Sequence, residues 1–129
     1  MPFIGLIITS AAYVIPVIFA IKRKVFHVGR TCAALTTTSL LYHGTQHPVC
    51  LKIDEIVAHT AGICYSIISV KNVLTKKRII DVAIAACALG SGWMFFFKSK
   101  PCTVEHISRY WHMGVHGLSN VGWTIYVFS

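Results

Sequence analysis

The chain has 129 residues, of which 55% are hydrophobic and 12% are charged, and its formal net charge is +8. Soluble domains carry roughly 25% charged residues, so this composition excludes an ordinary cytosolic globule, and the large apolar fraction excludes a disordered chain. The basic residues lie in short clusters between apolar runs, a pattern typical of membrane-flanking loops and not of a nucleic-acid-binding surface.

Five apolar segments follow one another along the chain. A bilayer core of about 30 Å requires roughly 20 apolar residues in a helix, which each segment approaches. The first segment ends at a cluster of basic residues, which disfavours a signal peptide because that cluster would come first. The second contains Arg30 near its start and is stopped by Pro48. We therefore predict an all-α membrane protein, a single domain built as a bundle of five transmembrane helices. The expected spans are residues 3–21, 25–46, 53–70, 79–97 and 110–128.

Lysine and arginine residues are unevenly distributed between the two ends of the expected bundle. Eight lie around the first and third connections, and four lie around the second and fourth. Because basic residues concentrate in cytosolic loops, we expect an exoplasmic N-terminus and a cytosolic C-terminus. The protein would then be a multi-pass protein of an endomembrane or of the plasma membrane.

Ionisable residues inside membrane spans are costly to bury, so their presence indicates a functional site. Ser39 and His43 lie four residues apart near the end of the second span, and His112 and His116 lie four apart near the start of the fifth. Residues at this spacing share one helix face. The second span runs outward, whereas the third and fifth run inward. We therefore expect these residues to lie at the same membrane level as Asp54, which opens the third span.

This set of side chains has a known metal chemistry. Three neutral imidazoles with a fourth position left for water are the ligand set of a catalytic zinc ion. The sequence therefore predicts Zn²⁺ bound by His43, His112 and His116. Asp54 and Ser39 would lie beside the ligands, where they would accept a proton from that water and orient it.

The order Ser39-x-x-x-His43, Asp54 and His112-x-x-x-His116 resembles the signature of the CREST superfamily, which includes alkaline ceramidases and the progestin and adipoQ receptors. The resemblance covers these positions and their order only. It implies zinc on the three histidines, with the serine and aspartate contacting the water, in a membrane hydrolase that cleaves a lipid amide or ester. Members usually have seven helices, so the chain resembles a shortened form.

Other roles are compatible with the same residues. A non-catalytic receptor or lipid-sensing scaffold would use zinc structurally, and a haem-binding electron-transfer protein would pair His59 with a histidine of the fifth span. His59 is also an alternative metal ligand to His43. The histidines of the fifth span could instead bond to neighbouring helices. Asp54 could favour a helix start, and the Ser39 hydroxyl could bond back to a backbone carbonyl.

Two cysteines fall in loops that are expected on the exoplasmic side. A disulfide between Cys50 and Cys102 would join the loop before the third span to the loop before the fifth. We therefore predict that such a bond would lie beside the metal site.

Overall fold

The computed structural model describes residues 3–76 and 105–128, together with the separate positions 79, 83, 86, 87, 90, 93, 94 and 97. The residues described are helical or in short turns, with no strand among them. The helices are α1 (Ile4–Ala11), α2 (Val14–Lys22), α3 (Phe26–Thr45), α4 (Pro48–Lys76) and α6 (Glu105–Phe128). The expected all-α fold is confirmed for this part of the chain. Most of the fourth expected span, residues 79–97, lies outside it.

Helices α1 and α2 together make up the first apolar segment, with an interruption at Ala12 and Tyr13. Pro16 has no N–H to donate to the Ala12 carbonyl, so the α-helical ladder breaks at this point. The amides of Tyr13 and Ile15 bond instead to carbonyls three residues back, at 3.2 and 3.0 Å. Ser10, just before the interruption, and Tyr13, within it, are both buried.

Helices α3 and α4 are joined by a short connection. α3 ends at Thr45, and Gln46 adopts the left-handed backbone conformation with φ 56°. Pro48 then opens α4, a position where its missing N–H is not needed. The expectation that Pro48 stops the second span agrees with this arrangement. The third span was expected to begin at residue 53, but α4 begins at Pro48, so Asp54 lies well inside the helix and not in its first turn.

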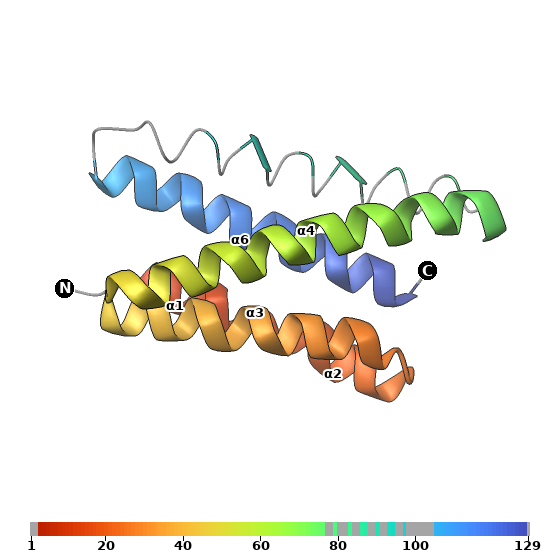
Figure 1. Ribbon diagram of the computed structural model, residues 1–129, viewed down its shortest axis with the longest axis horizontal. Helices are drawn as coiled ribbons and strands as arrows, with labels where there is room; N and C mark the ends of the chain where they lie inside the picture. Colours follow the sequence, from red (N-terminus) through yellow and green to blue (C-terminus); the bar gives the residue numbers. More distant parts are fainter. Residues whose placement is uncertain are drawn as a thin grey trace.

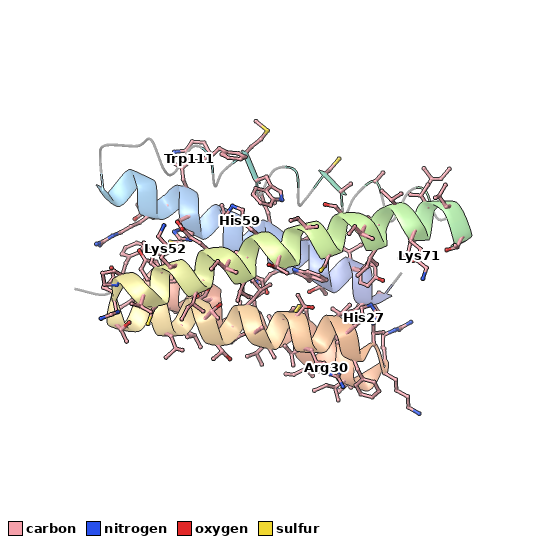
Figure 2. The ribbon with its side chains drawn as sticks, viewed as in Figure 1. His27, Arg30, Lys52, His59, Lys71 and Trp111 are labelled. Atoms are coloured by element: carbon pink, nitrogen blue, oxygen red, sulfur yellow. The ribbon has the colours of Figure 1, made fainter. Side chains whose placement is uncertain are left out.

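The described helices pack as one bundle, in which α3 contacts α1, α2 and α4, and α6 contacts α1, α2 and α3 (Figure 1). The Tyr65 hydroxyl donates to the Gly122 carbonyl at 3.2 Å and ties α4 to α6. Figure 2 shows Lys52 and Trp111 at one end of the bundle and His27 and Lys71 towards the other. The buried core consists of Tyr13, Ala20, Val28, Cys32, Leu35, Ala61, Tyr65, Trp123 and Val127.

Two described segments, Ile4–Lys22 and Pro48–Thr75, are long and apolar enough to cross a membrane. Helices α3 and α6 cover the second and fifth expected spans. Their mean hydropathy is lower than that of these two segments, and neither is apolar enough by the same criterion. Extended exposed apolar surface marks contact with lipid or with another protein. On α1, α2 and α4 the exposed apolar side chains include Ile4, Ile8, Ile15, Ile18, Ile56, Ile63, Ile67 and Leu74.

Candidate metal centre

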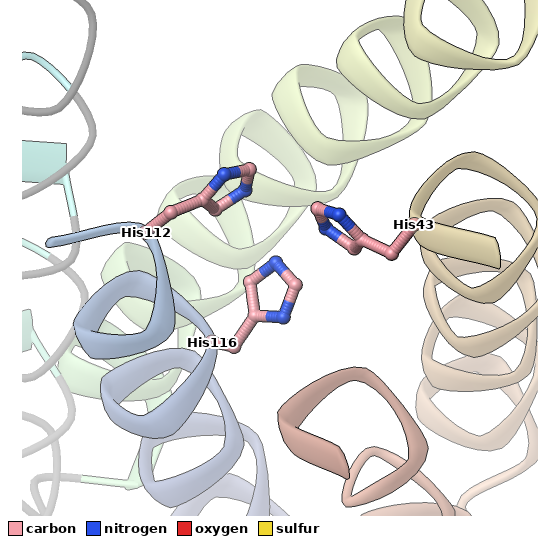
Figure 3. Close-up of side chains that lie close together, drawn as sticks. All are labelled: His43, His112 and His116. Atoms are coloured by element: carbon pink, nitrogen blue, oxygen red, sulfur yellow. The ribbon is translucent and has the colours of Figure 1, made fainter. Parts of the chain in front are cut away.

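Three histidines from distant parts of the chain meet where the last turn of α3 lies beside the first half of α6 (Figure 3). The fifth span was expected to begin at residue 110, but α6 begins at Glu105, so His112 and His116 lie deeper in the helix than expected. The ring centroid of His43 lies 5.0 Å from that of His112 and 5.4 Å from that of His116. The His112 and His116 centroids are 4.8 Å apart. One potential ligand nitrogen from each ring lies within 4.8 Å of the other two. The group could therefore hold a metal ion.

The nitrogen spacing is close to that of a tetrahedral metal site. Bonds of about 2.1 Å at tetrahedral angles place two ligand nitrogens about 3.4 Å apart. The nitrogens here are separated by no more than 4.8 Å. The three side chains point toward one another (Figure 3), so rotations about their side-chain torsions would close that difference.

The burial of these rings also fits a metal site. His43 and His116 are 1% and 4% exposed. His43 Nε2 is buried and has no hydrogen-bond partner within the described part of the chain. Buried polar atoms are almost always paired, so an unpaired one requires an explanation. A metal ion held between the rings would satisfy this nitrogen.

His116 is also contacted by α1, at the edge of its ring that carries Nδ1. This nitrogen lies 3.1 Å from Ser10 Oγ and 3.3 Å from Thr9 Oγ1. Neither residue was singled out in the sequence. The available signal was that Thr9 and Ser10 are the serine and threonine of an otherwise apolar first segment. The expectation that a histidine of the fifth span bonds to a neighbouring helix is therefore confirmed for His116. His116 also belongs to the histidine cluster, so the two roles are compatible.

Asp54 is 7% exposed and accepts hydrogen bonds from two residues of α3. Ser39 Oγ and Thr38 Oγ1 both donate to Asp54 Oδ1, each at 2.8 Å. The structure thus brings Ser39 and Asp54 together, one helical turn from His43 along α3. The Ser39 hydroxyl donates to this carboxylate and not to a backbone carbonyl. Thr38 is a partner of Asp54 that the sequence analysis missed, because its hydroxyl is one of several along α3.

His59, the alternative ligand, contacts Glu55 and Trp93. Its Nδ1 is 2.6 Å from the Glu55 carbonyl, and its ring packs edge-on against Trp93 with centroids 5.2 Å apart. Among the residues that the structure describes, the candidate metal group contains His43 and does not contain His59. The structure therefore favours His43 as the residue contributed from outside α6.

Aromatic and charged side chains surround this end of the bundle. The Tyr42 ring lies 4.7 Å from that of His43, and the Arg109 guanidinium lies over the Phe3 ring at 5.4 Å. Cys50 is half-buried in the first turn of α4. The Cys50 thiol is free in the structure, so the expected disulfide with Cys102, which lies outside the described residues, is not formed there.

Comparison with known proteins adds no relative to this picture. No protein-family model, curated protein or solved structure matches the chain. The resemblance to the CREST superfamily therefore stays an expectation drawn from the motif residues. Function is inferred below from the side-chain geometry.

Proposed function

We propose that this chain is a zinc-dependent membrane hydrolase that cleaves an amide or ester bond of a lipid, with His43, His112 and His116 as metal ligands. The observation that carries the proposal is the convergence of the three imidazoles, whose nitrogens lie within 4.8 Å of one another. Structural zinc sites usually have four protein ligands, whereas three histidines with an open position are typical of catalytic zinc. The motif resemblance points to the same class of reaction.

The metal and the chain would have separate tasks. When bound, zinc polarises a carbonyl group and makes water acidic enough to attack near neutral pH. Asp54 would accept the proton of that water. Its Oδ1 is held by Ser39 and Thr38, whereas Oδ2 accepts no hydrogen bond from the residues described. Ser39 would act by positioning this carboxylate, because its hydroxyl hydrogen is donated to Oδ1.

The proposed site lies at a depth that suits a lipid substrate. We infer a bundle of five transmembrane helices with an exoplasmic N-terminus and a cytosolic C-terminus, which puts the histidines just below the exoplasmic headgroups. The amide or ester bond of an acyl lipid lies at this level while its chain stays in the bilayer. Ceramide-like amides and other acyl lipids are therefore the substrate class that we propose.

Metal analysis of the detergent-purified protein tests the first step. We expect about one zinc per wild-type chain. Zinc should be largely lost in His43→Ala, His112→Ala and His116→Ala. His47→Ala is the matched control, because His47 lies close to His43 in the chain but is exposed and bonds to the Val49 amide. Folded wild-type protein without zinc, or equal zinc in all variants, would refute the proposed centre.

Turnover tests the second step. Fluorescent acyl amides and acyl esters in mixed micelles should release fatty acid in a zinc-dependent manner. Zinc binding without release of fatty acid from either class would favour the receptor or scaffold over the hydrolase.

A further inference from the structure

We infer that Ser10, together with Thr9, is a positioning residue that fixes the tautomer and the ring orientation of His116. This inference rests on the proposed function, because it concerns how α1 prepares one ligand of the zinc centre. Ser10 is 0% exposed and Thr9 is half-buried, and both lie in the last turn and a half of α1. The motif residues on α3, α4 and α6 do not include them.

The direction of each hydrogen bond follows from the partners of the hydroxyl groups. Ser10 Oγ lies 2.7 Å from the Leu6 carbonyl, and Thr9 Oγ1 lies 3.0 Å from the Gly5 carbonyl. A carbonyl oxygen only accepts, and a hydroxyl has a single hydrogen to donate. Both hydrogens are therefore directed at the backbone of α1. Both oxygens then face His116 Nδ1 as acceptors, so this nitrogen carries the hydrogen.

This assignment leaves the lone pair of His116 on Nε2. A neutral imidazole has one N–H and one lone pair, so protonation at Nδ1 makes Nε2 the ligand atom. Figure 3 shows one ring nitrogen of His116 turned towards His43 and His112 and the other turned away from them. Metal-ligating histidines usually donate their second nitrogen to a nearby oxygen in this way, and loss of that oxygen lowers metal affinity.

Further contacts hold α1 and α6 in the required register. Asn120 Nδ2 lies 2.9 Å from the His116 carbonyl and 3.4 Å from the Thr9 carbonyl, so one side chain joins the two backbones. The Tyr13 ring packs against the His116 ring with centroids 5.9 Å apart. The helix interruption lies between Ser10 and Pro16. Thr9 and Ser10, the polar side chains just before it, contact α6 at His116. α1 therefore acts on the site through His116 without adding a ligand.

The test removes both acceptor oxygens. In the double variant Ser10→Ala/Thr9→Val, the zinc dissociation constant, measured by competition with a chromophoric chelator, should rise about 10- to 100-fold. Thr9→Ser keeps an oxygen and should bind zinc like the wild type. Thr36→Val is the matched control, because within the described residues the buried Thr36 hydroxyl bonds to the Cys32 carbonyl in its own helix. A double variant with wild-type affinity, or an equal loss in Thr36→Val, would overturn the inference.

Nitrogen NMR of histidine-labelled, metal-free protein provides a readout that does not depend on zinc. We expect the Nδ1–H tautomer at His116 in the wild type and in Thr36→Val, with loss of that preference in the double variant. An Nε2–H tautomer at His116 in the wild type would overturn the assignment even if the three histidines bind zinc. A wild type with the expected tautomer but no zinc would instead overturn the proposed function.

Discussion

Replacement of Asp54 with asparagine separates proton acceptance from packing at the proposed site. Asparagine has nearly the same shape, and its amide oxygen can still accept from Ser39 and Thr38. It cannot accept a proton near neutral pH. The three histidines are untouched, so we expect the Asp54→Asn variant to bind zinc like the wild type. Turnover, in contrast, should fall.

The size of each effect follows from the contacts of the carboxylate. Hydrogen bonds to a charged group contribute about 1.5–3 kcal/mol and neutral ones about 0.5–1.5 kcal/mol. Asp54 accepts two such bonds at 2.8 Å, so the variant would lose about 2–3 kcal/mol of hydrogen-bond strength. Removal of a buried charge offsets part of this loss, which leaves a net decrease in stability below about 2 kcal/mol. Loss of a general base lowers turnover about 100- to 10,000-fold, equivalent to about 3–5 kcal/mol of activation free energy.

The assay combines hydrolysis of a fluorescent acyl amide, zinc content and unfolding in mixed micelles on the same preparations. Glu55→Gln is the matched control. This neighbouring carboxylate pairs with Lys52 at 3.4 Å, whereas the Ser39 and Thr38 hydroxyls donate to Asp54. We expect its turnover to change by less than about threefold, since exposed ion pairs contribute little. Near-normal turnover in zinc-loaded Asp54→Asn, or an equal loss in Glu55→Gln, would contradict the role of Asp54.

Other predictions concern packing and orientation. Tyr65→Phe removes the bond to the Gly122 carbonyl and should lower the free energy of unfolding by about 1 kcal/mol without changing zinc content. In Gly62→Ala, the new Cβ would lie 2.7 Å from Trp93 Cζ2, so we expect a loss of about 1–3 kcal/mol in the same unfolding assay. Gly44→Ala is its control, since its Cβ meets nothing within 4 Å, and it should be neutral or stabilising by up to about 1 kcal/mol. Impermeant labelling should reach an epitope at the N-terminus of the chain in intact cells and miss one at the C-terminus; the reverse pattern would refute the inferred orientation.

Local periodicity alone was enough to predict much of the arrangement. A helix places residues four apart on one face, so His112 and His116 had to share a face once α6 formed, as did Ser39 and His43. The apolar runs also predicted helices close to α3 and α6. The alternating direction of successive helices put the two histidine-bearing ends on one side of the bundle. These features depend on one helix at a time or on chain connectivity.

Other features depend on how the helices are rotated and packed against each other. The sequence predicts that Pro48 ends a helix, but Pro48 also starts the next helix. Asp54 therefore lies beyond the first turn of α4, where it contacts Thr38 and Ser39. A hydroxyl in an apolar helix can bond to its own backbone or to a neighbour, and hydropathy does not distinguish the two. The contact of Ser10 with His116 arises from the packing of α1 on α6, between residues 106 positions apart. Such contacts are set by side-chain geometry between helices, which residue spacing along one helix does not specify.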